Sequence, residues 1–301
     1  MGSLLYQALT SSSLILLGLY HLIFTTLNYL KSPHNYTSKP YHPLPTTSHP
    51  RLRPIQLYFI IFSLSIAILH HLILATYSDP LIKGSTPVHR LTSLQSASLL
   101  FLFLLLSLSL LLPLRLPHEF SFSLLSLLFL LHSSLQTNLS SLQTSSLEAK
   151  CDSVSSNLSA LASFMCLLLT LFPRLFPADV GLAGSLFLRG LWALQTGLTL
   201  YAEPFIPEGC HRLLDVVNGV EGSTKCDLDE SKFRALAILD LAFVVYVMLV
   251  MIVVLVVYAV VASAVGGVRR VGSYEALPTA GSSSPTDSNH IQMKALAGTQ
   301  A

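Results

Sequence analysis

Long apolar segments separated by short polar stretches make up most of this chain. Seven of them approach or exceed the roughly 20 residues that a membrane-spanning helix needs. They cover residues 3–30, 55–77, 91–112, 117–136, 155–173, 178–202 and 234–264. Because backbone amides in lipid need internal hydrogen-bond partners, and because these segments lack the alternation of barrel strands, each predicts a helix. The predicted fold class is all-α, a polytopic membrane protein of about seven transmembrane helices.

Prolines mark two of the predicted turns. Pro113 and Pro117 separate the third and fourth segments, and Pro173 and Pro177 separate the fifth and sixth. Proline interrupts a helix because it lacks an amide proton and clashes with the preceding turn. Each pair therefore predicts a tight helical hairpin.

Three polar pieces remain outside the apolar segments. They are a loop at 31–54 rich in Pro and His, an acidic loop at 203–233, and a Gly/Ser/Thr-rich end of the chain. We expect residues 1–264 to form the transmembrane domain and residues 265–301 to form a disordered cytosolic tail.

The composition supports a lipid environment. Charged residues make up 11% of the chain, against roughly 25% in soluble proteins. The net charge of +2 is spread along the chain, which argues against nucleic acid as a partner. Neither a C-x-x-C pair nor a GxSxG, Walker A or paired-carboxylate motif is present. We therefore expect no enzyme and no cofactor, and a lipid bilayer as the main partner.

The distribution of Lys and Arg predicts an orientation. The N-terminal segment carries none, whereas the first loop carries Lys31, Lys39, Arg51 and Arg53, and the last segment ends near Arg269 and Arg270. Basic residues favour the cytosol, so the N-terminus is predicted outside and the C-terminus inside, in the plasma membrane or an endomembrane. Basic residues in the later loops divide less clearly. The sequon at Asn35 is an opposing signal, since a glycan there would reverse the topology.

The sixth segment carries a charge near its middle. At 100° per residue, its polar side chains fall within an arc of about 120° on one helix face. They are Arg189, Trp192, Gln195, Thr196 and Thr199. Polar and small residues mark the side of a membrane helix that packs on other helices, so this helix is predicted to be central.

Arg189 needs a partner or water, because a charge at mid-depth costs at least a few kcal/mol. Asp240 is the one carboxylate well inside a predicted segment. We expect an interhelical ion pair that fixes the packing. The alternative is a solute or ion pathway that includes Arg189 and Asp240.

Three histidines lie at similar predicted depths. His70, His71 and His132 are weak candidates for a metal site or a pH sensor, because imidazole suits both roles. No ligand spacing such as HExxH supports a metal, so we expect hydrogen bonds to neighbouring helices instead. His21 stands alone near the inner side, which argues against bis-histidine haem binding.

Two short patterns lie outside the predicted helices. Cys210 and Cys226 flank a loop that is predicted to face outward, where a disulfide persists, and two free thiols are the alternative. In the tail, Tyr274 and Leu277 resemble a Yxx-apolar sorting signal read by clathrin adaptors, although such a pattern also arises by chance.

The stretch RGLWALQTGLTLYAEPFIPEGCH, with GLYHL at 18–22 and RLTSLQSAS at 90–98, resembles the transmembrane protein 45 family and its plant members. The matching positions are Gly190, Trp192, Gln195, Tyr201, Gly209 and Cys210. Arg189 replaces a Gln and Ser96 replaces a His of the family pattern, so the resemblance implies that any histidine-based site of the family is lost here. It implies a multi-pass membrane protein, and in plants an association with stress or pathogen response.

Together these features predict a non-enzymatic membrane protein with a scaffold, trafficking or stress-response role. A small-solute or ion transporter with a polar pathway around Arg189 and Asp240 is the alternative.

Overall fold

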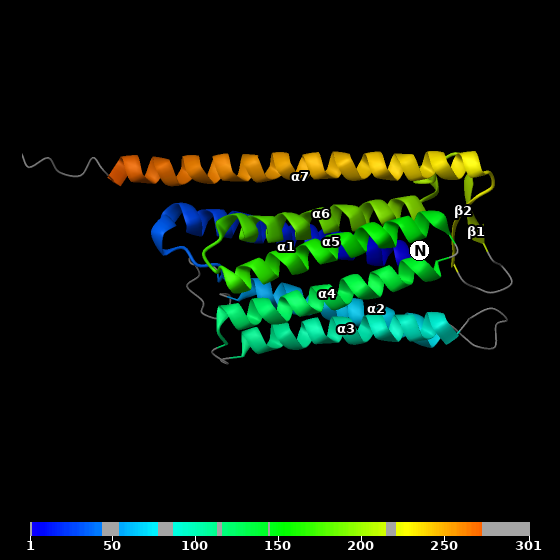
Figure 1. Ribbon diagram of the computed structural model, residues 1–301, viewed down its shortest axis with the longest axis horizontal. Coiled ribbons are helices and arrows are strands. Elements are labelled where there is room, and N and C mark those ends of the chain that lie inside the picture. Colours follow the sequence, from blue (N-terminus) through cyan, green and yellow to red (C-terminus); the bar gives the residue numbers. More distant parts are fainter. Residues whose placement is uncertain are drawn as a thin grey trace, which may run out of the picture. The chain divides into compact units, whose positions relative to one another are not determined.

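The computed structural model in Figure 1 contains seven long helices in the part of the chain that it describes. The described residues are 2–43, 54–77, 87–112, 116–143, 145–214 and 221–272. The helices are α1 (Gly2–Lys31), α2 (Ile55–Tyr77), α3 (Pro87–Leu111), α4 (His118–Leu142), α5 (Ser146–Leu171), α6 (Phe176–Tyr201) and α7 (Asp229–Gly272). Consecutive helices run antiparallel (Figure 1). This confirms the predicted all-α polytopic fold.

Six of these helices are long and apolar enough to cross a membrane by length and composition. The exception is α6, which has the length but carries Asp179, Arg189 and several small residues. Helix α6 tolerates them because protein covers most of its surface, and half of its residues are buried. Large apolar side chains on the outward faces of the other helices, such as Leu72, Leu105 and Leu255, are exposed, as lipid-facing residues are expected to be.

Helices α1 to α6 form a closed ring. Each packs on its neighbours in sequence, and α6 returns to pack on α1. Helix α7 lies outside the ring and contacts α5 and α6 through side chains. Lys150 pairs with Asp240, and Trp192 meets Phe243 edge-on at 5.6 Å. Because α1 to α6 close into a ring, side chains of helices on opposite sides of the ring can contact each other only in its interior.

Hydroxyl groups join α4 to α5 along much of their length. Ser126 bonds Ser163 at 3.2 Å, Ser133 bonds Ser156 at 3.0 Å, and Thr137 bonds Ser156 at 2.7 Å. The sequence had placed the ends of these segments at 136 and 155. Both helices extend further, because the serine-rich helical turns at the end of α4 and the start of α5 hydrogen-bond to each other. These turns therefore need no apolar side chains.

Glycines bring α1 and α6 into close contact. A Cβ on Gly18 would lie 2.7 Å from the backbone nitrogen of Phe187, and one on Gly190 would lie 2.8 Å from that of Ile15. Small residues allow such close approach between membrane helices. Helix α1 is thereby held against the most enclosed helix of the ring.

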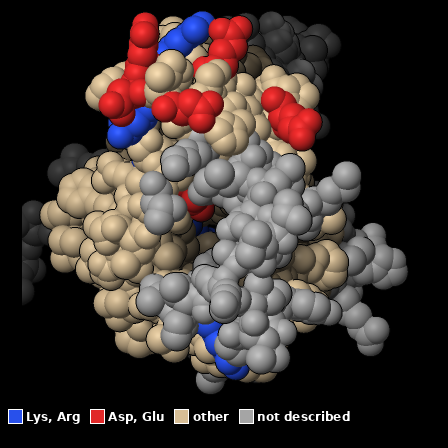
Figure 2. Space-filling view, turned by 90° about the vertical axis from the view of Figure 1, so that its right-hand side faces the viewer, with Lys and Arg blue, Asp and Glu red and all other residues tan. Residues whose placement is uncertain are grey.

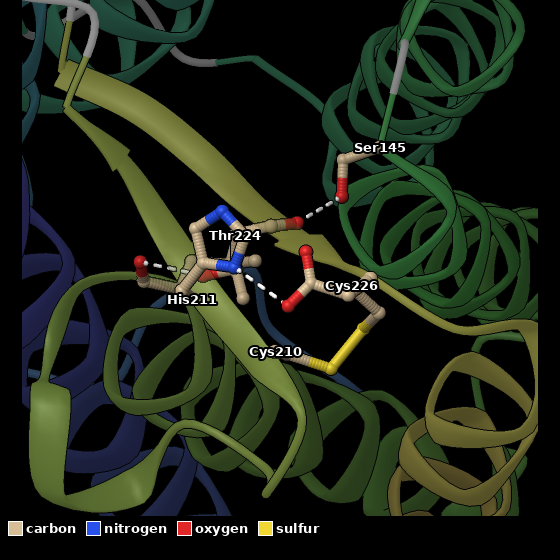
Figure 3. The surroundings of a disulfide bond; sticks show 7 residues. Ser145, Cys210, His211, Thr224 and Cys226 are labelled. Carbon is tan, nitrogen blue, oxygen red and sulfur yellow. Dashed lines mark hydrogen bonds and ion pairs between the residues drawn. A yellow bond between two sulfur atoms is a disulfide. The ribbon is translucent and has the colours of Figure 1, made fainter.

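The predicted acidic loop contains a β-hairpin, which the sequence did not indicate. Strands β1 (Cys210–Leu214) and β2 (Glu221–Cys226) pair antiparallel, and a disulfide joins Cys210 to Cys226 (Figure 3). Ser145, at the start of α5, donates a hydrogen bond of 2.6 Å to the carbonyl of Thr224. The Thr224 hydroxyl in turn donates to the carbonyl of Leu200 at 3.2 Å. The hairpin thus connects the start of α5 to the end of α6.

The two ends of the helix ring differ. The hairpin end contains the start of α1, the end of α6 and the β-hairpin. The loop end contains the end of α1, the start of α6 and a docked segment, residues 33–43, that follows α1. In Figure 2 the hairpin end faces the viewer. Charged side chains gather over the start of α7, where Asp229 and Glu230 lie in the first turn.

The chain divides into two units, Met1–Val265 and Gly266–Ala301. The boundary falls beside the predicted limit of the transmembrane domain at 264, although α7 itself continues to Gly272. The proposed sorting signal, Tyr274 and Leu277, lies outside the described residues.

Candidate functional site

Polar side chains gather at two places in the helix ring. The arginine cluster lies on the hairpin side and comes from α1, α2, α4 and α6. It comprises Tyr6, His70, His71, His132, Gln136 and Arg189. The aspartate cluster lies at the loop end and comes from α1, α6 and the docked segment. It comprises His21, Thr25, Tyr36, His42 and Asp179.

Arg189 lies inside the ring and reaches His132. Its guanidinium donates a hydrogen bond to Nε2 of His132, and Nε2 of Gln136 approaches the same nitrogen at 3.5 Å. Because both neighbours are donors, His132 Nε2 must be the unprotonated acceptor of a neutral imidazole. Helices α4 and α6 are not neighbours in the ring, so the contact crosses the ring interior.

Tyr6 and the two histidines of α2 complete the arginine cluster. The Tyr6 hydroxyl lies 3.2 Å from Nε2 of His71, and the Tyr6 ring stacks on His70 with 4.0 Å between centroids. The same hydroxyl lies within electrostatic range of Arg189, and His71 lies within range of His132. Four helices therefore bring one cation, three imidazoles and a phenol together.

The arginine cluster leaves polar atoms without partners. Nδ1 of His71 and Oε1 of Gln136 are buried and have no hydrogen bond among the described residues. Buried polar groups nearly always have partners, so such atoms indicate a place for water, an ion or a ligand. All six side chains of the cluster are of intermediate exposure rather than fully buried.

The predicted pairing of Arg189 with Asp240 is wrong. Asp240 lies outside the ring on α7 and pairs with Lys150 at 2.7 Å, with 59% of its side chain exposed. In the described part of the chain, no carboxylate lies within ion-pair distance of Arg189. The sequence placed both residues inside apolar segments, but it could not show which way each side chain faces.

The other polar residues of the same α6 face bind different helices. Trp192 is buried and donates its indole N–H to the carbonyl of Cys151 at 3.0 Å. Gln195 accepts a hydrogen bond of 2.7 Å from Tyr246 of α7 and donates one of 3.0 Å to Thr199. Thr196 is buried beside the Cys151 thiol. Trp192, Gln195 and Thr199 therefore fix the packing of α6, whereas the Thr196 hydroxyl is buried without a hydrogen bond among the described residues. Of the five polar residues on this face, only Arg189 joins the arginine cluster.

The aspartate cluster is built around Asp179, in the first turn of α6. Its side chain is fully buried, with one oxygen 2.7 Å from Nε2 of His21 and the other accepting a hydrogen bond from Tyr36. A carboxylate is favoured at a helix N-terminus. The expectation that His21 stands alone is wrong, because α1 and α6 bring His21 and Asp179 together although 158 positions separate them.

His42 anchors the docked segment to α1. Its ring lies 3.1 Å from the Thr25 hydroxyl and 3.2 Å from the Asn28 amide, and its backbone N–H donates to Gln56 of α2 at 2.8 Å. Burial, together with the neighbouring His21, lowers the pKa of His42 to about 3. The imidazole therefore stays neutral at physiological pH. Burial, together with Asp179, raises the pKa of Tyr36 above its usual value.

The three histidines proposed as weak metal ligands, His70, His71 and His132, do lie in one cluster. Among the described residues, however, no group of three or more His, Cys, Asp or Glu side chains is arranged to hold a metal ion.

Residues 118–259 match a family of unknown function, DUF716. The matched region includes Asp179, His132 and Arg189, whereas Tyr6 and the α2 histidines lie outside it. No curated protein matches the chain. The family description assigns no activity, and the resemblance to the transmembrane protein 45 family stays a prediction.

Proposed function

We propose that this membrane protein carries a small polar solute through its helix ring, with the arginine cluster as the binding site. The observation that supports the proposal is a charged Arg189 inside the ring, among half-buried polar side chains, two of which have spare buried hydrogen-bonding atoms. Most buried polar atoms that serve only packing are paired within the protein, and here two unpaired atoms lie in the same cluster as the Arg189 cation. Of the two roles expected from the sequence, this is the transporter. The trafficking role depends on Tyr274 and Leu277, outside the described residues.

The packing on one side of the arginine cluster supports a carrier that is closed at the loop end. Toward the loop end, buried apolar side chains of α4, α5 and α6 pack together, including Phe122, Phe129 and Leu182. The aspartate cluster lies beyond them. A carrier of this kind exposes its site to one side of the membrane at a time, so the loop end is the side that must open during transport.

Cysteine accessibility tests the proposal. In a background of Cys151→Ser and Cys166→Ser, which removes the two free thiols, we expect His132→Cys in liposomes to react with a membrane-impermeant methanethiosulfonate reagent. Leu128→Cys is the matched control, since Leu128 lies one turn away on α4 and is buried in an apolar cluster. Reaction at position 132 but not at 128 supports a watered site. If both positions resist the reagent equally, the arginine cluster is dry and the proposed function is wrong.

A further inference from the structure

We infer that the solute bound by the arginine cluster is a small carboxylate or similar oxyanion that also carries one hydrogen-bond donor. This inference rests on the proposed function and adds the chemical class of the ligand.

The charge balance of the arginine cluster favours an anion. Arg189 is a permanent cation with five N–H donors, and its contact with His132 uses only part of them. No carboxylate among the described residues pairs with it, and two acids of the adjacent helices α5 and α7 have other partners. Asp152 accepts a hydrogen bond of 3.0 Å from Gln143, and Asp240 pairs with Lys150. A cation held inside a membrane protein needs a counter-ion, and a ligand can provide it.

The guanidinium also favours a particular kind of anion. Its planar pair of N–H groups matches the two oxygens of a carboxylate, and such forked bonds are stronger and more specific than those to a spherical ion. The His132 contact holds the guanidinium in place through a neutral acceptor rather than a competing charge. A carboxylate can therefore displace this acceptor and gain the charge interaction.

The two unpaired atoms, Nδ1 of His71 and Oε1 of Gln136, indicate which further groups the ligand carries. If Tyr6 donates to Nε2 of His71, then Nδ1 of His71 carries the proton and is a donor without an acceptor. Gln136 directs its amide nitrogen toward His132, which leaves its oxygen as an acceptor without a donor. An oxyanion with one hydroxyl group satisfies both atoms: its oxygens accept from Arg189 and His71, and its hydroxyl donates to Gln136.

Thermal melting of the purified full-length protein in detergent tests this inference. The probes are sodium glycolate, which has the carboxylate and the hydroxyl, sodium acetate, which lacks the hydroxyl, and neutral glycolamide. All are compared at constant ionic strength. We expect glycolate to raise the melting temperature by roughly 2–4 °C near ten times its dissociation constant, acetate to raise it less, and glycolamide to leave it unchanged.

Three variants separate a specific site from a general salt effect. Arg189→Gln should abolish the response to glycolate, whereas Arg189→Lys should keep a weaker one because it keeps the charge. Lys150→Gln, which removes a cation outside the ring, should respond like the parent protein.

The possible outcomes are distinguishable. A response to glycolamide that depends on Arg189, without a response to the anions, would overturn the anion class and leave the binding site intact. Equal responses of the parent and Arg189→Gln to glycolate would overturn the inference. The accessibility of His132→Cys reports on the proposed function independently, because it does not depend on the probe.

Discussion

The arginine and aspartate clusters use the same two helices and serve different purposes. Both combine side chains of α1 and α6 with imidazoles, yet the side chains of the aspartate cluster are at most 4% exposed and those of the arginine cluster are half-buried. At Asp179 both carboxylate oxygens have partners, whereas the arginine cluster leaves two buried atoms unpaired. Complete pairing of the buried polar atoms indicates a structural role for the aspartate cluster. Unpaired buried atoms around a charge indicate a place for a ligand in the arginine cluster.

The largest expected effect is the loss of the carboxylate in the aspartate cluster. Asp179→Asn removes the buried carboxylate that His21 and Tyr36 both contact, and losing a hydrogen bond to a buried charged group costs about 1.5–3 kcal/mol for each bond. We expect a large fall in melting temperature in detergent. Tyr36→Phe removes one hydrogen bond to the same carboxylate and should cost only about 1–2 kcal/mol. If Asp179→Asn and Tyr36→Phe have the same melting temperature, Asp179 does not hold the loop end closed.

The disulfide should give the next largest effect. Cys210 and Cys226 close a loop with a sequence separation of 16, for which about 3 kcal/mol of stabilisation is expected. Replacing both with Ser should therefore lower the melting temperature clearly. The parent protein should also lose stability under reducing conditions, and the double variant should not respond further. A double variant as stable as the oxidised parent would show that the hairpin does not support the ends of α5 and α6.

Glycine packing between α1 and α6 should give an intermediate effect. A methyl group on Gly190 meets the backbone of Ile15 at 2.8 Å, so Gly190→Ala should cost about 1–3 kcal/mol through overpacking. Gly184 is the matched control on the same helix, because its Cβ would lie 3.6 Å from Val250, an ordinary contact. Similar melting temperatures for the two variants would rule out close packing of α1 on α6.

The smallest effect is a dependence on pH. The pKa of His42 is about 3 in the folded protein and about 6.5 in an unfolded chain. The unfolded state therefore binds the extra proton first, so the contribution of His42 to stability is complete above about pH 6.5 and is lost as the pH falls toward 3. We expect the parent to lose more stability between pH 7 and pH 5 than His42→Gln. His34→Gln, at an exposed position of the same segment, should follow the parent.

Much of the fold could be predicted from the sequence, because membrane helices follow directly from apolar length. The order of helices around the ring could not, since it depends on side-chain packing between distant segments. For this reason Asp240 was wrongly paired with Arg189, whereas α7 lies outside the ring. For the same reason the sequence did not reveal the pairing of His21 with Asp179. The position of a carboxylate in the first turn of a helix could have marked Asp179 as a candidate for a structural contact. The hairpin was missed because its strands are short and polar.

The central claim is that the charge of Arg189 faces a ligand space and does not hold the helices together. The most direct test compares the melting temperatures of Arg189→Gln and Asp179→Asn, each of which replaces the charged side chain of one cluster with a neutral amide. The account predicts that Arg189→Gln melts close to the parent and Asp179→Asn far below it. An Arg189→Gln variant that falls as far as Asp179→Asn would contradict the account, and would make Arg189 a structural residue like Asp179.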